Sequence, residues 1–391
     1  MSDLKKNVWE LDGWYDQTVA GDGSYYADNT FWSWGDNQNG ALGQNQSAPV
    51  LVSSPTQIPG TTWSKIAQGT GYNWHMAIKT DGTLWSWGYN GYGGLGQNAG
   101  PGGGILQYSS PVQIPGTTWN KVAISQRHFL AIKTDGTLWT AGSNQMGELG
   151  QNKADVSGGD TTDNSYSSPI QIPGTWTDVG TGTNRSHGIK TDGTLWSWGR
   201  NANGGPLGLN NNTQYSSPTQ IHGGGTNWVR FATSHDNAMA AIKTDGTLWT
   251  WGRSNHYNLP SNSDRSSPIQ VPGTTWSQVS GSYSSWWATK TDGTLWSWGN
   301  NPDGQLGQNN RTQYSSPVQI GTNTNWSKVR SGMNMCFFRT TGNALFAVGN
   351  GGNGRLGNKG TANVSSPVII GGGAWSDVGG YYNTHFGIRE W

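Results

Sequence analysis

The stretch Lys79-Thr80-Asp81-Gly82-Thr83-Leu84-Trp85-Ser86-Trp87-Gly88 decides the fold, because the same words return along the whole chain. Full, decayed or truncated copies cover residues 28–35, 79–88, 133–142, 190–199, 243–252, 290–299 and 339–349. Their final glycines, at 35, 88, 142, 199, 252, 299 and 349, are spaced by 53, 54, 57, 53, 47 and 50 residues. A fixed period near 50 residues is typical of solenoids and propellers.

Each copy predicts a β-hairpin. Asp81-Gly82 lies between two short β-prone runs, and this dipeptide is the strongest signal for a two-residue type I′ turn, which needs positive φ at both central positions. In the second strand Trp85 and Trp87 face opposite to Leu84 and Ser86. Neither face is strongly polar, so we expect each sheet to stack against another sheet on both sides.

Three more phrases complete each unit. A glycine-asparagine loop such as 94–98 follows the hairpin, then Ser-Ser-Pro opens a short strand, and another strand follows a tryptophan such as Trp63. Four strands in each of seven units predict an all-β protein, a seven-bladed β-propeller of four-stranded blades. Residues 30–34 supply only the last strand of a unit and residues 384–389 supply the strand before it, so we expect the N- and C-terminal strands to pair and close the ring.

Composition excludes several classes of protein. Charged residues are 12% of the chain, about half the ~25% of an ordinary globular protein, while there are 61 glycines and 24 tryptophans. The net charge of +1 gives no electrostatic footprint for nucleic acid or an anionic membrane. No run approaches the ~18 apolar residues of a membrane span, and no signal peptide is evident, so we expect cytosolic synthesis without membrane insertion. The lone Cys336 is expected to be buried and inert.

Residues 1–22 lie outside the repeats and form a separate N-terminal arm, with the propeller covering 23–391. The arm has two lysines against five acids, a net charge of −3, which is opposite in sign to a DNA-binding tail. Trp9, Trp14 and Tyr15 give it an aromatic, partly amphipathic character. Two readings stay open: the arm packs on the propeller rim, or it docks onto a partner or a second copy of the chain as an anchor.

The repeated words carry a family resemblance. LWSWGxNxxGxLGQN, then SSPxQI, then WxxVAxG resembles the repeat of the regulator of chromosome condensation family, and the resemblance covers residues 23–391. It implies a seven-bladed propeller closed by pairing of the two ends. The wording KTDGTLWSWG looks most like members found in bacteria and their viruses.

Few residues suggest chemistry. The histidines show no metal-binding spacing, no nucleophile elbow or phosphate loop occurs, and the KTDG aspartates sit at turns, so we predict no catalytic, cofactor-binding or metal site. Asp155, Asp160 and Asp163 lie in an insertion at 153–166, which we read either as a calcium loop or as a plain surface loop.

Aromatic residues near the turn before the second strand form a candidate binding surface on one face or in the channel. Seven residues make up this set: Tyr72, Trp74, Tyr283, Trp286, Trp287, Tyr381 and Tyr382. Tyrosine and tryptophan among Asn, Ser and Gly are typical of surfaces that bind proteins or sugars. Packing between the blades is the competing interpretation.

These observations favour a non-enzymatic recognition or structural module. We expect it on a virion, as a phage tail, fibre or capsid-decoration protein, or outside the cell at a cell surface. The expected partners are other virion or surface proteins and a cell-surface glycan, with homo-oligomerisation through the arm. The alternative, implied by the eukaryotic family member, is guanine-nucleotide exchange on a small GTPase at chromatin, which calls for a basic tail and a wedge-like insertion. A glycan-cleaving enzyme is a third possibility, but it would need two carboxylates that converge on a cleft, and few acidic residues of this chain lie outside turns.

Overall fold

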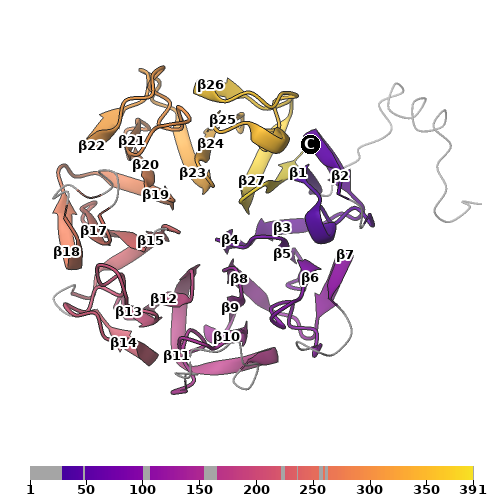
Figure 1. Cartoon of the computed structure of the whole chain (residues 1–391), viewed down its shortest axis with the longest axis vertical. Helices are drawn as coiled ribbons and strands as arrows, with labels where there is room; N and C mark the ends of the chain where they lie inside the picture. The colour runs from indigo at the N-terminus through magenta and orange to yellow at the C-terminus, as the bar shows by residue number, and fades with distance from the viewer. Residues whose placement is uncertain are drawn as a thin grey trace, which may run out of the picture.

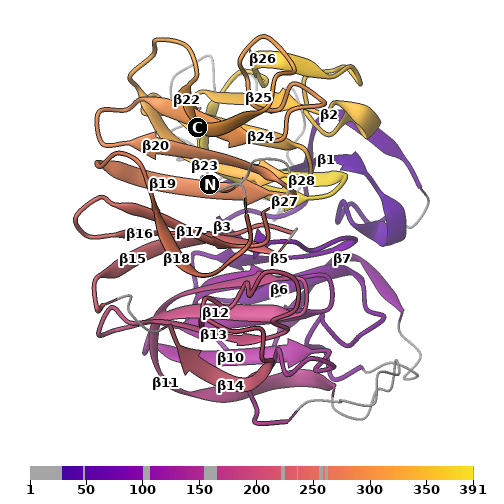
Figure 2. The same ribbon diagram turned by 60° about the vertical axis from the view of Figure 1, so that its left-hand side comes forward.

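The computed structural model describes residues 29–46, 49–99, 106–153, 165–221, 225–235, 237–254, 259 and 263–390. These residues form seven four-stranded antiparallel blades, which stand around a central channel (Figure 1). In an oblique view, neighbouring blades stack face to face (Figure 2). The all-β, seven-bladed architecture expected from the repeats is therefore confirmed.

The innermost strand of each blade lines the channel. Most of these strands begin at the tryptophan that the sequence marks. They are β3 (Trp63–Ile66) with its short continuation β4 (Gln68–Gly69), β8 (Trp119–Ile124), the second half of β11 (Tyr166–Gly182), β15 (Trp228–Thr233), β19 (Trp276–Ser282), β23 (Trp326–Gly332) and β27 (Ala374–Tyr381). β4 pairs in parallel with β8 of the next blade, so it joins two blades at the channel wall.

The second and third strands of each blade form the KTDG hairpins. They are β5 (Trp74–Lys79) and β6 (Leu84–Tyr89), β9 (His128–Lys133) and β10 (Thr137–Gly142), β12 (Arg185–Lys190) and β13 (Leu195–Gly199), β16 (Ala238–Lys243) and β17 (Leu248–Gly252), β20 (Ser285–Lys290) and β21 (Leu295–Gly299), β24 (Met335–Thr340) and β25 (Leu345–Gly349), and β28 (Thr384–Glu390) and β1 (Thr30–Asp36).

The predicted hairpins are confirmed, but the prediction that their turns are of type I′ is wrong. The Gly82 amide donates to the Lys79 carbonyl at 3.0 Å, and of the two central residues of the predicted turn only Gly82, at φ 77°, has positive φ. This is a type I turn followed by a left-handed glycine. Asp81 stays in the ordinary region because its carboxylate accepts bonds from the Thr83 amide at 2.9 Å and hydroxyl at 2.7 Å.

The outer strands begin near Ser-Ser-Pro. They are β2 (Leu51–Ile58), β7 (Gln107–Ile114), the first part of β11, β14 (Tyr215–Gln220), β18 (Arg265–Val271), β22 (Tyr314–Gln319) and β26 (Val364–Ile369). β11 runs from the outer edge of one blade into the inner edge of the next, which joins two blades into one eight-stranded sheet. Two 3-10 turns, η1 (Gln38–Gly40) and η2 (Gly352–Gly354), follow β1 and β25. Within the described ranges, no helix has the length and apolarity needed to cross a membrane.

The closing blade combines the two ends of the chain. β1 pairs with β28 in register from Thr30 opposite Arg389 to Gly35 opposite Thr384, and the strand order is β2-β1-β28-β27. The predicted closure by pairing of N- and C-terminal strands is therefore confirmed.

Aromatic residues fill the space between blades. Trp87, which is fully buried, packs on Phe31 and Phe386 of the closing blade at ring-centroid distances of 5.8 and 5.4 Å. Its Nε1 donates to the Ala41 carbonyl at 2.9 Å, so burial leaves this indole paired. Cys336 is fully buried, as expected.

The lysine that opens each KTDG turn lies against two tryptophan rings. At the end of β12, Lys190 Nζ is 3.7 Å from the Trp196 ring centroid and 5.1 Å from that of Trp176. Lys79, Lys133, Lys243 and Lys290 repeat the arrangement, and Arg389 takes the same place against Trp32 and Trp375. The lysine that recurs at the start of each KTDG hairpin thus has a packing role.

Replacing Lys190 by Met is expected to lower the free energy of unfolding by about 0.5–1 kcal/mol, because the methionine keeps the apolar stem but loses the attraction of the ammonium for the two rings. Urea denaturation checks this value. Lys153→Met, at an exposed position in the loop after β10, is the matched control, and an equal loss there would contradict the assigned interaction.

Candidate functional site

Strand register divides the ring into two faces. The second strand of a blade begins where the third ends, as in the pairing of Trp74 with Gly88, and the Tyr89 amide donates to the Asn73 carbonyl at 2.8 Å. The turn at residues 70–73 and the glycine-asparagine loop at 90–98 therefore lie at the same end of the blade. We call the side with these turns and loops in each blade the loop face, and the opposite side, with the KTDG turns, the turn face.

Five aromatic residues converge at the centre of the loop face. Tyr72 stacks on Tyr382 with ring centroids 4.5 Å apart, and His235 stacks on Tyr283 at 4.8 Å. Tyr381 lies 6.4 Å from Tyr72 and 6.0 Å from His235, joining the two pairs. These rings come from four blades and close one end of the channel. We call Tyr72, His235, Tyr283, Tyr381 and Tyr382 the mouth cluster.

The convergence of the four tyrosines follows the sequence expectation, whereas the three tryptophans of the same set lie elsewhere. Trp74, Trp286 and Trp287 are 2%, 0% and 0% exposed and belong to the hydrophobic cores between blades. They lie in β5 and β20, second strands whose two faces are both covered by neighbouring blades. Burial therefore removes these three from the candidate surface. Tyr381 is equally buried, at 2% exposed, so of the four tyrosines only Tyr72, Tyr283 and Tyr382 offer partly exposed side chains.

The remaining predicted site residues lie outside the described residues. They are Asp155, Asp160 and Asp163 of the insertion, and Trp9, Trp14 and Tyr15 of the arm. Their calcium-binding and anchoring roles stay predictions.

His235 is the member of the mouth cluster that the sequence interpretation missed. It lies seven residues after Trp228, the same offset that separates Tyr283 from Trp276 and Tyr382 from Trp375. Counting from the tryptophan that opens each innermost strand was therefore the available signal. The Gln126 side-chain amide, at the same offset from Trp119, lies 2.8 Å from His235 Nε2. Because an amide NH₂ can only donate, His235 Nε2 accepts this bond.

A second aromatic group lies on the loop face beside the mouth cluster. The Arg127 guanidinium lies 4.5 Å from the Tyr92 ring centroid, and Tyr89 packs edge-on against Tyr92 at 6.4 Å. Arg127 Nη1 also donates to Gln145 Oε1 at 2.6 Å. Tyr89 is 38% exposed. Arginine and tyrosine are the residue types enriched at protein interfaces.

Glu148 is buried beneath this group. Its Oε2 accepts a bond from the Met146 amide at 2.6 Å, and its Oε1 has no hydrogen-bond partner among the described residues. Burial raises the pKa of Glu148 to about 7, although backbone amides and Arg127 act in the opposite direction. The carboxyl is thus protonated in the folded state at pH values where it would ionise in the unfolded chain.

The Glu148→Gln variant is expected to become more stable than the wild type as the pH rises, because the wild type loses the stability that depends on a protonated Glu148. The pKa is raised from 4.5 to about 7 on folding, so its contribution to stability is full below pH 4.5 and is lost as pH rises through 7. Relative to the wild type, the variant should gain about 3 kcal/mol between pH 4 and pH 8. Chemical denaturation at both pH values measures this. The exposed Glu390→Gln is the control, and a pH-independent difference for Glu148→Gln would contradict the assignment.

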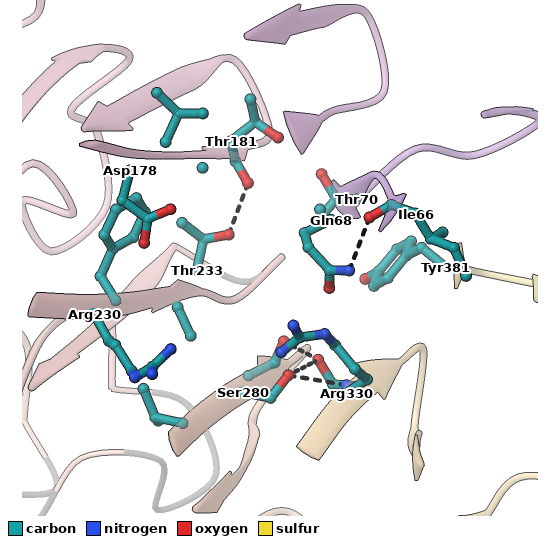
Figure 3. Close-up of a pocket in the computed structure, with 18 of the residues that line it drawn as sticks. Ile66, Gln68, Thr70, Asp178, Thr181, Arg230, Thr233, Ser280, Arg330 and Tyr381 are labelled. Carbon is teal, nitrogen blue, oxygen red and sulfur yellow. Dashed lines mark hydrogen bonds between the residues drawn. The ribbon is translucent and has the colours of Figure 1, made fainter. Parts of the chain in front are cut away.

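The central channel contains a cavity of about 390 Å³ (Figure 3). Charged side chains enter it two residues after the tryptophan of nearly every innermost strand. Blade by blade, these positions hold Lys65, Lys121, Asp178, Arg230, Gln278, Lys328 and Asp377. Tyr381 of the mouth cluster also lines the cavity, so the cavity reaches the cluster on the loop-face side.

Two ion pairs join neighbouring blades in the channel wall. Lys121 Nζ lies 3.0 Å from Asp178 Oδ1, and Lys328 pairs with Asp377. Asp377 also accepts a bond from the Ile66 amide at 3.3 Å. Burial alone would raise the pKa of Asp377, but Lys328 and Arg330 outweigh it and hold that pKa below its ordinary value. Both channel carboxylates therefore form ion pairs that join neighbouring blades. Over the described ranges, no three His, Cys, Asp or Glu side chains are grouped to hold a metal ion.

The fold and repeats match known proteins. The human WBSCR16 structure superposes with a TM-score of 0.80 at 20% identity, covering 93% of this chain and 100% of that one. Prp20p of Saccharomyces cerevisiae gives a TM-score of 0.79 at 15% identity, covering 93% and 92%. At this level of identity the likeness concerns the fold alone.

Sequence relatives include the ultraviolet-B receptor UVR8 and the mitochondrial RCC1 domain-containing protein RUG3, both of Arabidopsis thaliana. They are 28% and 29% identical, and each match covers 58% of this chain. This chain spans about half the length of these curated relatives, 50% in each case. They are plant proteins and lend no support to the expected likeness to bacterial and viral members.

The family model described as the regulator of chromosome condensation (RCC1) repeat matches residues 28–73, 81–132, 192–241 and 292–338, and a second model of that repeat matches 119–148. Together the matches span more than half of the chain, and each of the four longer matches runs from the third strand of one blade into the inner strands of the next. The chain therefore belongs to the regulator of chromosome condensation repeat family.

Proposed function

We propose that this propeller is a non-enzymatic protein-binding module that uses its loop face. The convergence of four tyrosines and a histidine at the centre of that face carries the proposal. Such rings supply large contact area at low cost in conformational entropy, and Arg127 over Tyr92 extends the same chemistry outward. The yeast fold relative Prp20p, whose structure was described with its binding to Gsp1p and histones, supports the use of such a ring for protein partners.

Backbone strain at Tyr382 adds support. Its φ is 59°, a left-handed conformation that a bulky residue rarely adopts. In other blades the positive φ falls one position later in the turn, on asparagines such as Asn184 and Asn334. Conformations of this kind cost about 1–3 kcal/mol and cluster at functional sites. In this conformation the Tyr382 ring stacks on Tyr72 and the residue stays partly exposed.

Binding is favoured over catalysis because the titratable groups near these sites have structural roles. The KTDG aspartates bond their own turns, as Asp81 does, and Asp178 and Asp377 pair with lysines. His128 is buried with its Nε2 2.9 Å from Ser186 Oγ. We propose no catalytic role for these groups and no cofactor.

The location of the protein and the class of its partner are further proposals. A virion or cell-surface location, with a surface protein or glycan as partner, rests on the low charge and the wording of the repeats. Exchange of guanine nucleotide on a small GTPase is the alternative. Adding the protein to a GTPase loaded with fluorescent nucleotide separates the two, because accelerated release would favour exchange and contradict a purely binding role.

Variants of the mouth cluster test the proposal once a partner is recovered from the native source. Tyr283→Ala and Tyr382→Asn are each expected to cost at least about 2 kcal/mol, roughly thirtyfold in Kd. Asparagine accepts positive φ, so the turn at residue 382 is kept. Thr134→Ala on the turn face is the control. Unchanged affinity in both mouth-cluster variants would contradict the proposal.

A further inference from the structure

Arg330 is the single large side chain at its level of the described channel wall. It lies four residues after Trp326, and the other blades place small residues at that offset from their own tryptophan. These are Ala67, Ala123, Gly180, Ala232, Ser280 and Gly379. The register confirms the equivalence, since Arg330 pairs with Phe337 as Gly379 pairs with Phe386. Gly180, Ala232 and Ser280 line the cavity together with Arg330, so at this level the cavity wall carries one guanidinium among small residues (Figure 3).

The cavity is strongly cationic although the whole chain is nearly neutral. Five cations line it against the two carboxylates Asp178 and Asp377, a net charge of +3, compared with +1 for all 391 residues. The cations are Lys65, Lys121, Arg230, Lys328 and Arg330. The two carboxylates pair with Lys121 and Lys328, and neither arginine forms an ion pair with a described carboxylate. A narrow channel with walls of low dielectric constant focuses such a field.

Hydrogen-bond donors in the cavity are left without protein partners. Arg330 Nη1 donates to the Val329 carbonyl at 3.1 Å, but its buried Nε has no partner among the described residues. Thr70 and Thr181 line the same cavity, are 2% and 0% exposed, and carry hydroxyls that are likewise unpaired within the described part of the chain. Buried donors are normally satisfied, so these three point to a ligand that accepts hydrogen bonds.

We propose that the central channel binds a small tetrahedral oxyanion of the phosphate or sulfate class, with Arg330 as its principal contact. The planar fork of a guanidinium matches two oxygens of such an anion, and Thr70 and Thr181 add neutral donors to the lining of the same cavity. Arg230 and Lys65 are exposed and lie at the end of the cavity away from Tyr381, where an anion would enter.

The charge state of the channel is consistent with this site. Burial lowers the pKa of Arg330 and Arg230 lowers it further, while Asp377 acts in the opposite direction. A bound anion would relieve both the desolvation and the repulsion between the two arginines. This site centres on Arg330 and meets the mouth cluster only at Tyr381, so anion binding is tested independently of the proposed protein partner.

Isothermal titration with inorganic phosphate, at constant ionic strength set with chloride, tests the proposal on the full chain. We expect saturable binding of one anion per chain, competition by sulfate, and at least about tenfold weaker binding in Arg330→Met. Arg311→Met, at an exposed position in the loop before β22, should bind as the wild type does.

Arg330→Met should fold, because methionine replaces a buried cation by an apolar side chain of similar length. If it does not fold, Arg230→Met at the exposed end of the cavity gives the same test and is also expected to weaken binding. Absence of saturable binding by the wild type would overturn the proposal. Wild-type affinity in both channel variants, or equal affinity for acetate, would overturn it as well.

Discussion

Acidification from pH 7.5 to pH 5 should lower the free energy of unfolding by about 4 kcal/mol through His75 and His128 alone, measured in the Glu148→Gln variant. Burial lowers the pKa of each of these fully buried imidazoles from 6.5 to about 3. Below pH 6.5 these imidazoles bind protons in the unfolded chain but stay neutral in the folded protein, so the free energy of unfolding decreases as the pH falls from 6.5 toward 3. At pH 5 this amounts to about 2 kcal/mol for each histidine.

The Glu148→Gln background matters because Glu148 has the opposite dependence and would mask part of the loss. His187 and His385 add to it with the same sign, since burial holds both pKa values well below 6.5. In that background, His75→Phe should remove about 2 kcal/mol of the pH dependence. Phenylalanine suits the site because His75 already packs on Phe386 with ring centroids 4.5 Å apart. An unchanged pH profile in the His75→Phe variant would contradict a neutral, buried imidazole.

Replacing Trp34 by Ala should cost about 3–5 kcal/mol of unfolding free energy. Trp34 is fully buried, where the closing blade meets β24 of the blade formed by β23 to β26. It packs on Phe337 and Trp375 at 5.7 and 5.9 Å, and its Nε1 donates to the Arg355 carbonyl at 2.9 Å. Removing the indole leaves a cavity and an unpaired carbonyl at the closure, so amide exchange in β28 should accelerate most.

Trp32→Ala is the matched control for this prediction. Trp32 lies on the same strand, is only half-buried, and packs under the Arg389 guanidinium at 4.6 Å. Its loss should cost clearly less than that of Trp34. Equal losses in urea denaturation, or unchanged exchange in β28, would show that closure does not depend on the buried face of β1.

The repeats predicted the fold because its determinants are local. A KTDG hairpin, a Ser-Ser-Pro strand and a tryptophan-led strand recur in each unit, and Thr30–Trp34 with Thr384–Arg389 left one blade to be completed by the two ends. The turn type was not predictable from Asp81-Gly82 alone. Asp81 bonds Thr83 with its side chain, and this competes with the positive φ that a type I′ turn would require.

The candidate sites were only partly predictable. Tyr72, Tyr283 and Tyr382 share a place in their repeats, so their convergence could be expected, but nearness to the turn wrongly drew in Trp286 and Trp287, whose strand is covered on both faces. His235 was missed because it lies three residues before its second strand, whereas the three tyrosines lie two residues before theirs, so only the count from Trp228 aligns it. Arg330 could be singled out only by comparing it with the six small residues at the same offset in the other blades. Its proximity to Arg230, which comes from a different blade, depends on closure of the ring and could not be seen in the sequence.

The most direct test of the loop-face proposal is site-specific photocross-linking in the native source. A photoreactive phenylalanine at Tyr382 should capture one protein partner, and capture should fall when Tyr283→Ala is added, whereas the same group at the exposed Thr80 on the turn face should not capture that partner. Equal capture from Thr80, or capture from Tyr382 that Tyr283→Ala leaves unchanged, would contradict a binding site centred on the mouth cluster.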